Sequence, residues 1–82
     1  MQIFYSSKAN DQLASLSSQD QIRIATKMRF YAILPDPMRY SKYIAIRKAF
    51  RFRIGDYRIF FHIKDSTIFI RTIERRDKAY MI

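Results

Sequence analysis

The spacing of apolar positions in the first 37 residues predicts a short strand followed by two helices. Residues 2–5 form the strand, and a helix begins directly after it, with Ser6 or Ser7 as its N-cap. A capping box that opens at Ser18 starts a second helix, which ends near Leu34 because prolines follow. Such a pair is typical of a helical hairpin. Its apolar stripes are Ala9, Leu13 and Leu16 in the first helix and Ile24, Ala25, Met28, Tyr31 and Ala32 in the second.

After residue 37 the period of the apolar positions changes from helical to alternating, which indicates strands. Residues 50–54 alternate apolar side chains with arginine. Gly55, the only glycine in the chain, then forms a two-residue turn with Asp56. Further strands are predicted at residues 57–63 and 67–73, with a turn at 64–66 between them, and at residues 43–48.

This order of elements predicts an α+β fold, in which both helices pack on one face of an antiparallel sheet. Side chains alternate across a strand, so the apolar positions of residues 50–54 face the helices. Arg51 and Arg53 then lie on the opposite face, which we call the open face. By the same rule the returning strand adds Arg58, Phe60 and His62 to the open face, and Phe60 offers a ring either to a nucleic-acid base or to a protein partner.

Clustered arginines on one face repel one another, which favours a bound polyanion as the reason for their presence. Protection of a strand edge against aggregation is the alternative explanation. The charge distribution supports the polyanion: the 82 residues carry a net charge of +9, with four basic and three acidic residues in 1–37 but twelve basic and four acidic residues in 38–82. Solubility alone does not require this asymmetry.

The composition excludes several kinds of chemistry. There is no cysteine, so disulfides and thiolate ligands are absent, and with His62 as the single histidine a zinc site is not expected. No apolar run approaches the ~20 residues that cross a bilayer, and the first residues lack the order of a signal peptide. We therefore expect one domain over residues 1–82, in the cytoplasm, with no membrane partner, no metal and no small-molecule cofactor.

Two segments resemble a known family. Residues 50–59, FRFRIGDYRI, are similar to the central hairpin of the RelE/ParE toxin superfamily, and residues 73–80, IERRDKAY, resemble its closing pattern of basic residues and a tyrosine. The resemblance extends over nearly the whole chain and implies the RelE-like fold. It also implies a toxin of a type II toxin–antitoxin system, neutralised by a cognate antitoxin. RelE-like members cleave mRNA on the ribosome, whereas ParE-like members inhibit DNA gyrase and are not nucleases.

Position by position, the resemblance to the RelE-like branch assigns catalytic roles to Arg51, Arg53, Arg58, Arg76 and Tyr80. The chemistry implied is attack of a ribose 2′-hydroxyl on the adjacent phosphorus without a metal ion. Tyr80 would orient that hydroxyl or accept its proton, and Arg76 would stabilise the leaving oxygen. The ribosome-dependent members known best carry lysines at Arg51 and Arg53; arginine binds phosphate bidentately but does not act as a base.

Three hypotheses about function follow from these residues. The first is a ribosome-dependent endoribonuclease with the ribosome and mRNA as partners, and Tyr80 and the open-face arginines favour it. The second is a ParE-like gyrase inhibitor without nuclease activity, and the third is a basic nucleic-acid-binding module without chemistry. Antitoxin contact is expected from helix positions outside the core stripe, namely Ile22, Phe30 and Ile33.

Overall fold

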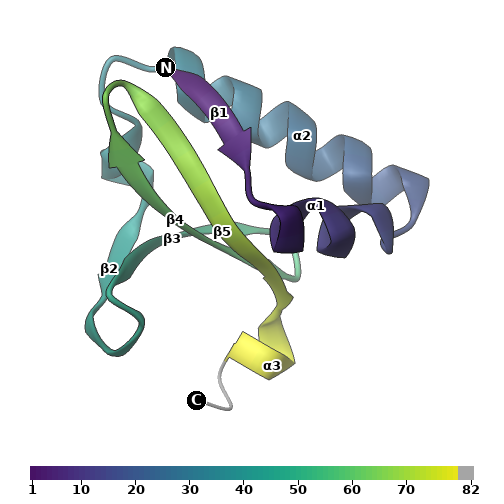
Figure 1. Cartoon of the computed structure of the whole chain (residues 1–82). Coiled ribbons are helices and arrows are strands. Elements are labelled where there is room, and N and C mark those ends of the chain that lie inside the picture. Colours follow the sequence, from purple (N-terminus) through teal and green to yellow (C-terminus); the bar gives the residue numbers. More distant parts are fainter. Residues whose placement is uncertain (80–82) are drawn as a thin grey trace.

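The computed structural model describes residues 1–79, which form five strands, two longer helices and a short third helix (Figure 1). No helix within that range is long and apolar enough to span a membrane. The strands are β1 (Gln2–Tyr5), β2 (Lys42–Ile44), β3 (Ala49–Ile54), β4 (Tyr57–Lys64) and β5 (Thr67–Arg75). The helices are α1 (Ser7–Ala14), α2 (Ser18–Ile33) and α3 (Arg76–Ala79), with 3-10 turns η1 (Pro37–Tyr40) and η2 (Ala45–Arg47).

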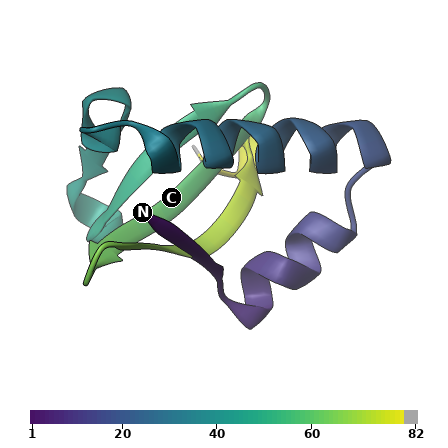
Figure 2. The ribbon, with the colours of Figure 1, turned by 90° about the horizontal axis from the view of Figure 1, so that it is seen from above.

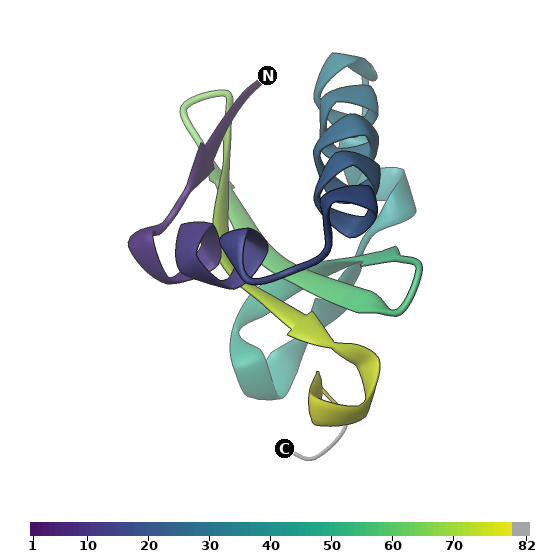
Figure 3. The same cartoon turned by 90° about the vertical axis from the view of Figure 1, so that its right-hand side faces the viewer.

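All five strands belong to one sheet, in the order β1-β5-β4-β3-β2. The hairpins β2–β3, β3–β4 and β4–β5 are antiparallel, and β1 pairs with β5 in parallel. Seen from above, α2 crosses the sheet and α1 lies beside β1 (Figure 2). Both helices cover the same face, and α3 lies on the other side of the sheet (Figure 3). The predicted α+β fold is confirmed, and the parallel β1–β5 pair is an addition to it.

Serine side chains begin both longer helices, because each accepts a hydrogen bond from a backbone amide that has no partner within its helix. Ser6 Oγ accepts from the amide of Ala9 at 3.0 Å, and Ser17 Oγ accepts from the amide of Asp20 at 3.2 Å. The capping box predicted at Ser18 is therefore wrong by one residue. Gln21, the expected partner in that box, instead donates from Nε2 to the carbonyl oxygen of Leu16 at 2.9 Å.

The core lies between α2 and the inner face of β3, β4 and β5. The buried residues of α2 are Ile24, Met28, Tyr31 and Ala32, as the helical spacing predicted. Tyr31 stacks on Phe52 of β3, and Phe52 stacks on Phe61 of β4, each at a centroid distance of 4.1 Å. Each of these large side chains contributes about 1.5–3 kcal/mol through burial. The stack therefore fixes the β3–β4 hairpin, which carries the open-face arginines, against the helix.

Residues with a positive φ close the turns around this hairpin. Gly55 has φ +57°, a backbone conformation that disfavours residues with a side chain, and a Cβ atom there would lie 3.1 Å from Nη1 of Arg23. The predicted strand at residues 43–48 is wrong in its second half. β2 ends at Ile44, η2 follows, and Lys48 at φ 51° redirects the chain into β3.

Candidate functional site

The pairing of β3, β4 and β5 brings the predicted arginines together on the open face. Arg53 of β3 is the Cα partner of Arg58 in β4, and Arg58 is in turn the partner of Glu74 in β5. Arg51 lies one row further along, opposite Phe60. Arg53 is exposed and Arg51 is half-buried. The structure thus places three of the five predicted site residues on neighbouring positions of a single hairpin.

Arg58 differs from its neighbours because its side chain is only 1% exposed. Its Nη1 atom donates to the carbonyl oxygens of Tyr57 at 3.1 Å and Gly55 at 3.4 Å. Carbonyl oxygens offset part of the cost of burying a guanidinium group. Truncating Arg58 would therefore remove buried volume, although its strand position is on the open face, since Arg58 is among the largest fully buried side chains.

Arg47 lies across the open face between Glu74 and Phe60, a position that no pattern in the sequence predicted. Arg47 pairs with Glu74 through Nη2 and Oε2, and its Nη1 lies 3.3 Å from Oε1. Its guanidinium carbon is 3.8 Å from the centroid of the Phe60 ring, a cation–π geometry. Phe60 is consequently 3% exposed and packs with Ala49 and Ile44. Neither of the two roles expected for Phe60, stacking on a base or contact with a protein partner, fits the structure, because Arg47 already covers its ring.

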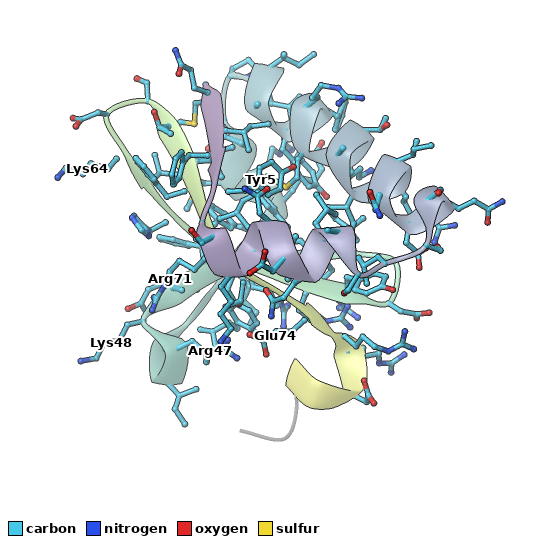
Figure 4. All side chains as sticks on the ribbon, turned by 45° about the vertical axis from the view of Figure 1, so that its right-hand side comes forward. Tyr5, Arg47, Lys48, Lys64, Arg71 and Glu74 are labelled. Carbon is cyan, nitrogen blue, oxygen red and sulfur yellow. The ribbon has the colours of Figure 1, made fainter. Side chains whose placement is uncertain are left out.

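Glu74 lies beside the arginine row, by which we mean Arg51, Arg53 and Arg58, and two hydrogen-bond donors hold its carboxylate. Arg47, which lies next to Glu74 in Figure 4, contacts its carboxylate, and so does the hydroxyl of Thr72, which donates at 2.7 Å. Burial raises the pKa of Glu74, but the hydrogen bonds from Arg47 and Thr72 outweigh burial, so the pKa is lowered overall. A carboxylate that is ionised and already bonded in this way is a poor acceptor for a further proton. Glu74 therefore orients the guanidinium group of Arg47 and is not expected to act as a general base.

A cavity of about 470 Å³ lies beside Glu74, along the part of β5 that extends beyond β1. Lys8, Arg47 and Arg75 contribute positive charge to its lining, and Tyr57 contributes a ring. The Tyr57 hydroxyl donates to Oδ2 of Asp20 at 2.9 Å. Burial and then this hydrogen bond raise the pKa of Tyr57. Tyr57 is therefore held in its neutral form and is not a phenolate base for the neighbouring arginines.

The C-terminal segment is attached to the turn of the arginine hairpin. The amide of Arg76 donates to the carbonyl oxygen of Asp56 at 2.7 Å, and α3 packs beside β4 and β5. The side chain of Arg76 is exposed. Tyr80, the fifth predicted site residue, lies outside the described residues. The backbone of Arg76 is thus placed next to Gly55–Asp56, at the same end of the hairpin as Arg53 and Arg58.

His62 is exposed on the open face, four positions beyond Arg58 along β4. Its ring stacks on Phe69 of β5 at 5.2 Å with an interplanar angle of 12°. The separation from Arg58 is about 13 Å at ~3.3 Å per residue, so His62 does not belong to the arginine row. No three His, Cys, Asp or Glu side chains gather into a candidate metal site within residues 1–79.

Comparison with solved structures defines the class of protein to which this arrangement belongs. The chain is similar to a chain of the toxin–antitoxin complex RelBE2 from Mycobacterium tuberculosis, with a TM-score of 0.75 and 22% identity. The match covers 92% of this chain and 90% of that one. The fold is therefore RelE-like, a helical pair on one face of a sheet whose other face carries the basic residues.

The family follows from the sequence match. A family described as "ParE toxin of type II toxin-antitoxin system, parDE" matches residues 3–80. The chain therefore belongs to this family of toxins, within the RelE/ParE superfamily, and the resemblance noted in residues 50–59 and 73–80 is confirmed. A search of curated proteins found no match.

Proposed function

We propose that this toxin is a ribosome-dependent endoribonuclease that cleaves mRNA and thereby inhibits translation. The arrangement of Arg51, Arg53 and Arg58 on adjacent open-face positions of one hairpin is the observation that carries the proposal. A guanidinium group matches a phosphate with two parallel hydrogen bonds and keeps its charge at any physiological pH. The exposed Arg53 and the buried Arg58 beside it supply a positive field on this face of the sheet.

The proposed reaction is an internal transfer at one phosphodiester. The ribose 2′-oxygen forms a bond to phosphorus, the bond from phosphorus to the 5′-oxygen breaks, and the products are a 2′,3′-cyclic phosphate and a 5′-hydroxyl. Arg51 and Arg53 stabilise the charge on the phosphorane oxygens. Tyr80 orients the 2′-hydroxyl or accepts its proton, and Arg76 stabilises the departing 5′-oxygen, as the family resemblance implies. Neither Glu74 nor Tyr57 is placed in the role of base, for the reasons given above.

A cognate antitoxin is proposed as the protein partner. Ile22, Phe30 and Ile33 are exposed and lie within about a quarter-turn of one another on α2, opposite the core stripe. Tyr40 of η1 extends this apolar surface, since its ring is 6.4 Å from that of Phe30. An amphipathic helix of the antitoxin, laid on these residues, would bury the surface. The RelBE2 structure is that of such a toxin–antitoxin complex.

Inhibition of DNA gyrase is the second candidate function, because the matching family is described by its ParE members. A gyrase inhibitor requires a binding surface and no proton transfer. It would account for arginine at positions 51 and 53, where a base is not needed. The same basic face would then bind an acidic protein surface or DNA in place of RNA.

Translation of a defined message in a cell-free extract, followed by primer extension, tests the proposal. We expect the toxin to produce cuts at codon-related positions, and the exposed substitution Arg53→Ala to reduce cutting by about a hundredfold or more. Arg29→Ala removes an equally exposed arginine from α2 and serves as the matched control. An intact message together with blocked supercoiling by gyrase would contradict the nuclease and support the second candidate.

A further inference from the structure

Three aromatic rings form a row across the open face, at some distance from Arg53 and Arg58. Phe4 of β1 and Phe69 of β5 are Cα partners with ring centroids 5.6 Å apart, and Phe69 pairs in turn with His62 of β4. Phe4 is 56% exposed and His62 is exposed, so the two outer rings of the row are accessible to solvent. We call Phe4, Phe69 and His62 the aromatic row.

Packing within the chain does not account for this row. Ile3 and Tyr5, the neighbours of Phe4 in β1, turn inward and contact the core, whereas Phe4 turns outward. An exposed phenylalanine in a short edge strand costs solubility and invites association, so a natural edge strand is expected to carry a charged residue there. The position of Phe4 beside two further rings is therefore better explained by a ligand with flat, apolar faces.

Exposed cations surround the aromatic row. Lys64 lies two positions beyond His62 on β4, and Arg71 lies two positions beyond Phe69 on β5. Nη1 of Arg71 lies 3.5 Å from the carbonyl oxygen of Arg47, which places Arg71 beside Lys48. Lys48, Lys64 and Arg71 project on the side of the sheet away from Tyr5, α1 and α2 (Figure 4). One acidic residue, Asp65, follows Lys64 in the β4–β5 turn, so the four side chains carry a net charge of +2.

From this arrangement we propose that the aromatic row and its cations bind single-stranded RNA, as a second site next to the arginine hairpin. Bases stack on the exposed rings of Phe4 and His62, and phosphates lie on Lys48, Lys64 and Arg71. Aromatic platforms flanked by positive charge are the usual means of holding single strands without reading their sequence. A peptide partner would bury the rings equally well but would not require cations on both sides of the row.

The aromatic row lies on the same face as the arginine site, within reach of one RNA strand. His62 lies about 13 Å from Arg58 along the same strand, so one RNA strand can extend over both positions. The aromatic row then holds the nucleotides that flank the cleaved phosphodiester. The choice of RNA over single-stranded DNA rests on the proposed function. The argument from stacking and charge is independent of that function.

Fluorescence anisotropy with the purified full-length toxin tests the second site. The probe is a fluorescein-labelled oligonucleotide of about twelve nucleotides, within the site sizes of single-strand binders, fully 2′-O-methylated to block cleavage. Phe4→Leu retains apolar volume but removes the flat ring, and should weaken binding about 5- to 100-fold. Phe4→Trp should bind as well as the wild type. Phe30→Leu, at an exposed ring on α2, is the control and should change binding less than about twofold.

The variant His62→Ala and a DNA oligonucleotide of the same sequence complete the test. His62→Ala, at an exposed position, should also weaken binding, which guards against a folding defect in Phe4→Leu. Equal binding by Phe4→Leu, His62→Ala and Phe30→Leu would overturn the inference, as would loss of antitoxin binding with unchanged RNA binding. Tighter binding of DNA of the same sequence would overturn the choice of RNA. If RNA binding depends on Phe4 but the toxin does not cleave a message in the cell-free extract, the proposed nuclease function is overturned and the second site is retained.

Discussion

The ion pair between Arg47 and Glu74 predicts a measurable coupling in stability. Their side chains are 20% and 18% exposed, between the surface pairs that contribute little and the buried pairs that cost 3–5 kcal/mol to break, so we expect a coupling energy of about 2 kcal/mol. The cation–π contact of Arg47 with Phe60 adds about 1 kcal/mol. Arg47→Ala should therefore lower the free energy of unfolding by about 2–3 kcal/mol, which lowers the Tm by about 8–24 °C in a domain of this size.

A double-mutant cycle with Arg47→Ala and Glu74→Gln, measured by chemical denaturation, gives the coupling directly. Asp77→Asn is the matched control: its pair with Arg75 is 3.9 Å long and 59–75% exposed, so its loss should cost less than about 0.5 kcal/mol. Additive effects of Arg47→Ala and Glu74→Gln, within about 0.5 kcal/mol, would refute the reasoning.

The same pair predicts how stability depends on pH. Arg47 and Thr72 hold the pKa of Glu74 below its ordinary value of 4.5 in the folded state. A group with a depressed folded pKa contributes all of its stability above the unfolded pKa, and this contribution is lost as the pH falls through the folded pKa. The stability difference between wild type and Glu74→Gln should therefore be full at neutral pH and shrink below about pH 4.5. A difference that grows on acidification would contradict this sign.

Three further substitutions test separate parts of the structure. Ser66 has φ 58°, so Ser66→Gly should stabilise the β4–β5 turn by about 0.5–1 kcal/mol and raise the Tm, and a lower Tm would contradict it. Tyr57→Phe should lower the free energy of unfolding by about 1 kcal/mol, because the hydrogen bond to Asp20 is lost; no loss would mean that this bond contributes nothing. Tyr80→Phe should slow message cleavage about ten- to a thousandfold with ribosome affinity unchanged, and near-normal cleavage would remove Tyr80 from the chemistry.

The periodic patterns of the sequence predicted the elements well because they reflect burial directly. Residues 2–5 form β1 as expected, and the stripe from Ile24 to Ala32 is buried in α2. Alternation also placed Arg51 and Arg53 on the correct face. The cap at Ser17 was missed because two adjacent serines carry the same local signal, and only the backbone conformation distinguishes them, with Ser17 extended at ψ 155°.

The same patterns did not predict how deeply the open-face side chains are buried, nor which strands distant in the sequence pair with one another. The alternation of side chains along β4 predicts the face to which Arg58 points, but it does not predict which residues cover Arg58. Its burial, with 1% of the side chain exposed, was therefore not predicted. The covering of Phe60 depends on η2, which replaces half of a predicted strand because Lys48 adopts a left-handed conformation. Regular antiparallel pairing continued from the β4–β5 turn would place Ile73 opposite Arg58, and only the register shift between Phe60 and Phe61 brings Glu74 to that position. No local feature of β1 indicated its parallel pairing with β5.

The open face separates two requirements of RNA cleavage that a single lysine could meet alone. Arg51 and Arg53 provide permanent charge for the phosphate, and for that reason they provide no proton acceptor. Two nearby groups that could accept a proton are each held in one protonation state, Glu74 by Arg47 and Thr72 and Tyr57 by burial and the hydrogen bond to Asp20. For a nuclease built on this face, the family resemblance assigns the proton acceptor to Tyr80, in the segment that follows Arg76, whose amide donates to the carbonyl oxygen of Asp56 in the hairpin turn. A gyrase inhibitor has no such need, so the chemistry of residue 80 distinguishes the two functions more sharply than the arginines do.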